Sequence, residues 1–171
     1  MDIQALASTI PVEGEAILEG LDFIRSGKEY LTFSLGQENY GVDILRVKEI
    51  RGWEAPTLIP NSPDYVKGVI NIRGTIIPIV DLRIRFGVGK TEYLPVTVVI
   101  VLTVGSVEKS RMMGFVVDAV SDVLSAHQEE IKAAPAFGAN IPTNMIEGLV
   151  NVGDSVVTLL STDQLLDLED L

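Results

Sequence analysis

The fold is decided by residues 68–82, which read Gly-Val-Ile-Asn-Ile-Arg-Gly-Thr-Ile-Ile-Pro-Ile-Val-Asp-Leu. β-Branched residues dominate 69–72 and 76–80, a pattern typical of two strands. The Asn-Ile-Arg-Gly between them predicts a hairpin turn, in which Gly74 suits a backbone position with positive φ. Arg73 is therefore expected at the tip of an otherwise apolar hairpin, where it presents a permanent cation with five hydrogen-bond donors.

The apolar pattern of this hairpin recurs 80 positions later, in residues 148–162. Two further pairs of segments are similar, residues 40–42 to 113–115 and residues 47–50 to 120–123. One supersecondary unit has therefore been used twice. Each unit, with about five short strands and a small helix, has the size of a small β-barrel. Closing such a sheet avoids exposed strand edges.

The duplication separates residues that serve the fold from residues that are free to serve function. Arg73 and Gly74 correspond to Gly153 and Asp154 in the second copy. A turn at this place needs small or polar residues, and it does not need arginine. Arg73 is therefore the first candidate for a functional residue, against the alternative of a solvated arginine in a turn.

The two copies suggest how the chain is divided. Residues 1–28 differ from the rest and predict an N-terminal extension, either flexible or a short helix over residues 13–25. A sharper alternative is an amphipathic helix that binds a partner. Residues 29–95 are expected to form the first β-barrel and residues 96–171 the second, which ends in a helix near residues 161–170.

Shorter elements are expected within the copies. Asp81 can cap a short helix at residues 82–86. Residues 44–50 form either a short helix or a strand. Further strands are predicted at residues 30–35, 94–104, 111–117 and 120–124.

Composition limits the class of partner and the compartment. The 171 residues include 24 acidic and 13 basic side chains, which give a formal charge of −11. Such a chain has no electrostatic footprint for nucleic acid or an anionic membrane, but it suits a partner with a basic surface. The absence of cysteine, of a secretory signal and of a long apolar run indicates a cytoplasmic protein without direct membrane insertion.

No stretch of the chain predicts a catalytic or metal site. The segment 87–91 resembles the end of a phosphate-binding loop, but Ile84 stands where that motif requires glycine. His127 is the only histidine, so zinc is not expected and a surface position is. Asp43 and Asp118 occupy comparable places in the two copies and leave one alternative open, a small aspartate-dependent hydrolase. We expect no catalytic residue, no metal and no cofactor.

A longer series of motifs resembles the CheW family, the coupling proteins of bacterial chemotaxis. The matching segments are YLTFSL (30–35), YGVDIL (40–45), VKEIRG (47–52), KGVINIRG (67–74), PIVDLR (78–83), VVIV (98–101) and GFVVDAVSDVL (114–124). The resemblance covers residues 29–168. It implies a mainly β domain of two intertwined five-stranded SH3-like barrels, and it implies no enzymatic activity.

The resemblance also implies partners and contact residues. Proteins of this family bridge the cytoplasmic tip of methyl-accepting chemoreceptors to a histidine autokinase, so we expect a cytoplasmic adaptor associated with membrane-bound arrays through the receptors. The positions that match receptor-binding residues are Arg73, Glu49, Val47, Val98 and Val123. Those that match residues facing the kinase's regulatory domain are Leu31, Ile44 and Val47. A coupling protein for a chemotaxis-like pathway with a different output is an open alternative.

Overall fold

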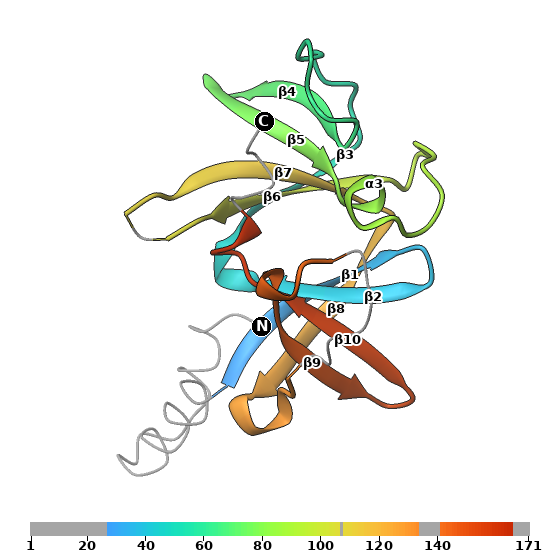
Figure 1. Ribbon diagram of the computed structural model, residues 1–171, viewed down its shortest axis with the longest axis vertical. Helices are drawn as coiled ribbons and strands as arrows, with labels where there is room; N and C mark the ends of the chain where they lie inside the picture. The colour runs from blue at the N-terminus through green and yellow to red at the C-terminus, as the bar shows by residue number, and fades with distance from the viewer. Residues whose placement is uncertain (1–26, 107, 134–140, 166–171) are drawn as a thin grey trace, which may run out of the picture.

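A computed structural model describes residues 27–106, 108–133 and 141–165 of the chain (Figure 1). The expected N-terminal extension and most of the expected C-terminal helix lie outside these residues. Within the described part of the chain, residues 162–164 form a turn, and the expected C-terminal helix is not evident. The described residues form ten strands in two five-stranded sheets, which lie one above the other in Figure 1.

Sheet A has the strand order β8-β1-β2-β10-β9, and sheet B has the order β3-β6-β7-β5-β4. The strands are β1 (Gly27–Leu35), β2 (Glu38–Asp43), β3 (Val47–Gly52), β4 (Val66–Ile72), β5 (Thr75–Asp81), β6 (Val98–Val104), β7 (Arg111–Val117), β8 (Ala119–His127), β9 (Ile146–Val152) and β10 (Ser155–Leu160). Short helical segments are η1 (Ile44–Arg46), α3 (Leu82–Phe86), η2 (Gln128–Glu130) and η3 (Thr143–Met145).

The topology shows a reciprocal exchange of strands between the two copies. Sheet A joins β1 and β2 of the first copy to β8, β9 and β10 of the second, and sheet B does the reverse. Corresponding strands occupy the same place in both sheets, as a duplication requires. The mainly β fold with two five-stranded sheets is confirmed. The boundary after residue 95 divides the two copies in the sequence, but each sheet contains strands from both copies.

Each sheet is curled into a barrel. In sheet B the loop after β3 pairs with β4, and in sheet A the segment after β8 pairs with β9. The two closing bridges are Thr57 with Val69 in sheet B and Lys132 with Leu149 in sheet A. Glycine is needed at both places because the chains approach closely. A Cβ atom on Gly68 would lie 2.1 Å from the Thr57 carbonyl oxygen, and one on Gly148 would lie 2.3 Å from Ile131. These glycines match across the copies and serve the fold.

The buried apolar side chains form three cores within the described residues. The largest lies between the sheets and includes Leu31, Phe33, Tyr40, Phe86, Leu102 and Phe115. A smaller core fills sheet B with Ile72, Ile77, Ile79, Val99, Val101 and Val116. The third, inside sheet A, is made of Tyr30, Ala126, Val150, Val157 and Leu159. The shared central core makes the two sheets one packed body.

A buried ion-pair network ties the two sheets together at α3. The predicted helix is confirmed, and Asp81 caps it by accepting the Arg83 N–H. The Arg83 guanidinium donates to both carboxylate oxygens of Asp81 at 3.0 and 2.9 Å and to Asp118 at 2.9 Å. Asp118 also accepts the Gly36 N–H from the β1–β2 turn at 2.6 Å. Burial opposes the charge of Arg83, but its bonds to the two carboxylates outweigh burial and raise its pKa.

Candidate partner-binding site

The tip of the β4–β5 hairpin is a two-residue turn with a left-handed backbone. Gly74 has φ of 86°, as predicted, and Arg73 has φ of 50°. Two consecutive positive φ values are the geometry that matches the twist of a tight hairpin. The Asn71 side-chain oxygen accepts the Gly74 N–H at 2.8 Å and fixes the turn.

Arg73 occupies a position where its residue type is unfavourable. A left-handed backbone costs a non-glycine residue about 1–2 kcal/mol, and the second copy has Gly153 (φ 60°) at the same place. The Arg73 side chain is 79% exposed. Its ion pair with Glu49, at 3.4 Å, belongs to the class of exposed pairs that contribute at most about 1 kcal/mol. The fold therefore supplies no reason for arginine at this tip.

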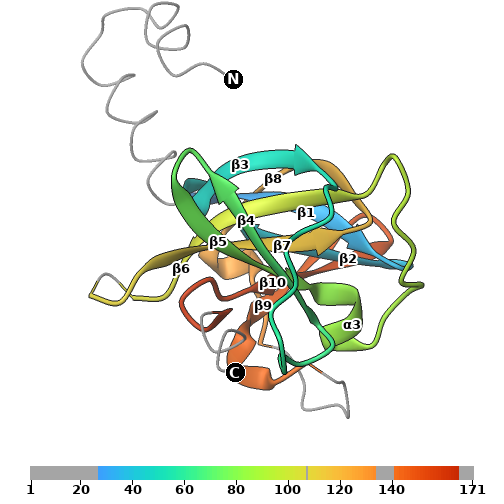
Figure 2. The same ribbon diagram turned by 90° about the horizontal axis from the view of Figure 1, so that it is seen from above.

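Arg73 is the first member of a line of alternating charges. Because sheet B is curled, the tip of the β4–β5 hairpin lies beside β3 (Figure 2), and Arg73 meets Glu49 there. Glu49 also contacts Arg51 at 3.7 Å, and Arg51 contacts Glu54 at 3.3 Å. The structure thus brings together two predicted receptor-binding residues and adds Arg51. The alternation along β3, which places residues 49 and 51 on one face, was the signal for it.

The three valines predicted to contact the receptor lie farther apart than the charged residues do. Val47 pairs with Leu102 at one end of the β3–β6 ladder, and Val98 pairs with Gly52 at the other end. Both valines are half-buried against the central core. Val123 is 44% exposed but lies on β8 of sheet A. The charged pair and Val47 thus share strand β3 and its neighbourhood, whereas Val123 belongs to the other sheet.

The residues predicted to face the kinase differ in exposure. Leu31 is 5% exposed and belongs to the central core, so its side chain offers little area to a partner. Ile44 is half-buried in η1, and Val47 follows directly. Between them Leu45 is 83% exposed, the largest exposed fraction of a large hydrophobic residue among the described residues. The prediction from sequence missed Leu45, because only the structure shows that η1 turns it outward.

The candidate catalytic residues all have structural roles. Asp43 caps η1 by accepting the Leu45 N–H at 3.0 Å. Asp118 is held by Arg83 and Gly36. The backbone N–H of His127 donates to Glu130 at the start of η2. Among the described residues, no group of three His, Cys, Asp or Glu side chains is placed to hold a metal. None of the described helices is long and apolar enough to cross a membrane.

Comparison with known proteins decides the family, since the model of the CheW-like domain matches residues 29–170. The chain belongs to the CheW-like family. A chemotaxis protein CheW of Klebsiella aerogenes is 46% identical over 145 residues, which cover 85% of each chain. The chemotaxis protein CheW of Bacillus subtilis is 31% identical over 147 residues, covering 85% of this chain and 91% of the relative.

A solved structure supports the same assignment. The scaffolding protein TtCheW of Thermoanaerobacter tengcongensis superposes with a TM-score of 0.71 at 33% identity. The match covers 78% of this chain and 84% of that one. CheW-like proteins are scaffolds and adaptors, so this chain is a chemotaxis coupling protein and not an enzyme. The alternative of an aspartate-dependent hydrolase was therefore wrong.

Proposed function

We propose that this CheW-like chain is a cytoplasmic adaptor that binds both a methyl-accepting chemoreceptor and a histidine autokinase and so couples them. The main support for the proposal is the exposure and the backbone conformation of Arg73. It is an exposed arginine, in a left-handed backbone conformation, where the duplicate hairpin has glycine. Strain of this kind persists where a functional contact requires it.

On the receptor side, the partner is the cytoplasmic helical hairpin of the receptor. Its apolar face packs on Val47, Val98 and Val123, in a helix-in-groove mode. Arg73 donates hydrogen bonds to a carboxylate or to carbonyl oxygens at the receptor tip, and Glu49 accepts from a basic group. Each contact is modest, and an array of receptors adds avidity through multivalency.

On the kinase side, the partner is the kinase's regulatory domain. The contact is apolar at its centre, as is usual for a protein interface. Ile44 and Val47 border this surface, Leu31 supports it from the core, and the exposed Leu45 adds the largest accessible area. No cofactor and no metal take part. The protein reaches the membrane-bound array through its receptors and does not insert into the membrane.

The substitution Arg73→Glu tests the receptor site. We expect the fold to stay intact, because the side chain is exposed and the second copy has no arginine there. Binding to a receptor signalling fragment in pull-downs should fall about tenfold or more, since the variant places a like charge against the receptor and loses the guanidinium bonds.

The matched control is Lys109→Glu, which makes the same charge change at an exposed turn between β6 and β7. It should leave receptor binding unchanged. Normal receptor binding by the folded Arg73→Glu protein would show that the site is assigned wrongly. Equal losses in both variants would mean that only net charge matters.

A further inference from the structure

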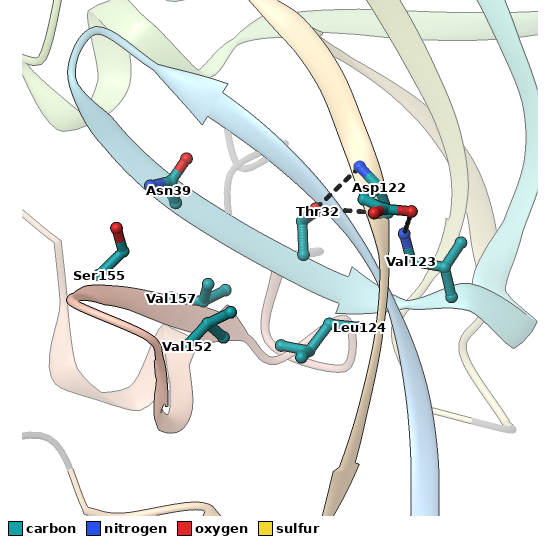
Figure 3. Close-up of a pocket in the computed structure, with 8 residues that line it drawn as sticks. All are labelled: Thr32, Asn39, Asp122, Val123, Leu124, Val152, Ser155 and Val157. Atoms are coloured by element: carbon teal, nitrogen blue, oxygen red, sulfur yellow. Dashed lines mark hydrogen bonds between the residues drawn. The ribbon is translucent and has the colours of Figure 1, made fainter.

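A cavity of about 260 Å³ opens at the mouth of sheet A, between β1, β8 and the β9–β10 hairpin (Figure 3). Its walls include Thr32, Asn39, Val123, Leu124, Val152 and Val157. The Thr32 hydroxyl donates to the Asp122 carbonyl oxygen at 2.9 Å and accepts the Asp122 N–H at 3.0 Å. Thr32 is thus satisfied within the wall, and the remaining lining is mostly apolar.

The corresponding space in sheet B is filled. The strand registers match Thr32 to Val101, Asn39 to Met112, Val152 to Ile72 and Val157 to Ile77. In sheet B, Ile72, Ile77 and Val101 are buried in one core, and Met112 packs against it. In sheet A each counterpart is shorter or more polar, so the same barrel mouth is left open.

The two barrel mouths also differ in charge, because the acidic residue is paired with an arginine in sheet B and has no such partner among the described residues of sheet A. In sheet B, Arg73 at the tip of the β4–β5 hairpin pairs with Glu49 of β3. In sheet A, Asp122 stands where Glu49 does, but Gly153 replaces the arginine. The Asp122 carboxylate accepts the Val123 N–H at 2.8 Å. Neither Asp122 nor Asp154, at the adjoining turn, forms an ion pair with any residue that the structure describes.

We propose that this cavity receives an apolar side chain that stands next to an arginine or lysine on a partner protein. The apolar group fills the volume that Met112 and the isoleucines fill in sheet B, and the cation pairs with Asp122 as Arg73 pairs with Glu49. Val152, which lines the cavity, is 43% exposed and leaves apolar surface at the entry. The site lies on the opposite sheet from Arg73.

The test uses the full chain with isotope-labelled methyl groups and two peptides, Ac-Ala-Leu-Arg-Ala-NH₂ and Ac-Ala-Leu-Glu-Ala-NH₂. We expect saturable NMR shifts of the Val123 and Leu124 methyls with the arginine peptide, and binding about threefold weaker with the glutamate peptide. The variant Asp122→Asn should remove this preference. Absence of saturable shifts in the wild-type protein would overturn the proposal.

A variant in which larger side chains fill the cavity tests whether the peptide binds in the cavity. The triple substitution N39M/V152I/V157I installs the sheet B side chains in sheet A, and an amide NMR spectrum checks its fold. Saturable shifts should disappear in this variant and persist in Arg73→Glu. Equal binding by the filled variant would overturn the cavity as the site, and an unchanged preference in Asp122→Asn would overturn the role of the cation. Neither result tests the contacts of Arg73 and Glu49 on sheet B, whereas Val123 belongs both to the cavity wall and to the proposed receptor surface.

Discussion

At the scale of single residues, Arg83 and its counterpart in the second copy, Asp163, each form an ion pair, but with opposite charge. Arg83 follows the β4–β5 hairpin, and Asp163 follows the β9–β10 hairpin 80 positions later. Arg83 pairs with Asp81 and Asp118, and its side chain is 1% exposed. Asp163 pairs with Arg46 at 2.9 Å, and it is 55% exposed. The ion pairs of Arg83 are therefore buried, whereas the ion pair of Asp163 lies at the surface.

The substitution Asp81→Asn should lower the free energy of unfolding by about 3–5 kcal/mol, because it leaves the buried Arg83 charge poorly compensated. The matched control Asp163→Asn should cost less than about 1 kcal/mol. Urea denaturation measures both. Similar costs for the two variants would contradict the account of the buried network.

Three tyrosines make stability depend on alkaline pH. Burial and then a neighbouring carboxylate, Glu147, Glu38 or Asp81 respectively, raise the pKa of Tyr30, Tyr40 and Tyr93. The unfolded chain loses these protons above about pH 10, while the folded chain keeps them. Stability should therefore be complete below pH ~10 and fall as the pH rises further.

The variant Tyr93→Phe isolates one of these groups. Its decline in unfolding free energy above pH ~10 should be shallower than that of the wild-type protein by about 1.4 kcal/mol per pH unit, the value for one proton. Urea titrations across this range measure the slope. Identical slopes would show that Tyr93 ionises alike in the folded and unfolded chains.

Some of these residue roles could be predicted from the sequence and others could not. Comparing the copies singled out Arg73, because the hairpins differ there while their strands agree. Its left-handed backbone could not be predicted, since arginine is unfavourable in that conformation. Asp81 was expected as a helix cap, but its pairing with Arg83 and the link to Asp118 depend on contacts between distant parts of the chain.

At the scale of strands and helices, the two parallel strand pairs depend on glycine. In sheet B, Gly114 lies opposite Ile79, and a Cβ atom on it would lie 2.6 Å from the Ile79 side chain and 2.9 Å from Val99. In sheet A, Gly41 lies opposite Leu159 in the same arrangement, at 3.0 Å. The glycines that the sequence comparison matched are thus explained by close packing across the parallel pair.

The substitution Gly114→Ala should lower the melting temperature and cost about 1–3 kcal/mol through overpacking. Gly52→Ala, at a strand position where nothing lies within 4 Å of the added Cβ, is the control and should be nearly neutral. Thermal unfolding followed by circular dichroism compares them. An equal effect of both would mean that close packing around the added Cβ does not set the cost.

The strands of the hairpins were the easiest elements to predict, because β-branched runs and turn residues mark them locally. The bounds of β7 were predicted correctly, whereas β8 extends further, to His127. Residues 44–50 divide into η1 and the start of β3. The exchange of strands between copies is not visible from local patterns, since a strand of either copy satisfies the same apolar alternation.

At the scale of the whole molecule, the exchanged strands make one body with distinct surfaces. Sheet B carries Arg73 and Glu49, and sheet A carries the open cavity. The exposed Leu45 lies on η1, which connects β2 of sheet A to β3 of sheet B. The shared core between the sheets holds these surfaces in fixed relation. A rigid body of this kind suits a scaffold, whose task is to hold partners at set positions.

The most direct test of the central claim is a reconstitution that measures the rate of kinase autophosphorylation. A histidine autokinase and a receptor signalling fragment are mixed with the wild-type chain, with Arg73→Glu, or with neither. Our account predicts that receptor control of the rate appears only with the wild-type chain and is lost with Arg73→Glu. Receptor control of the same size without the chain, or with Arg73→Glu, would contradict it.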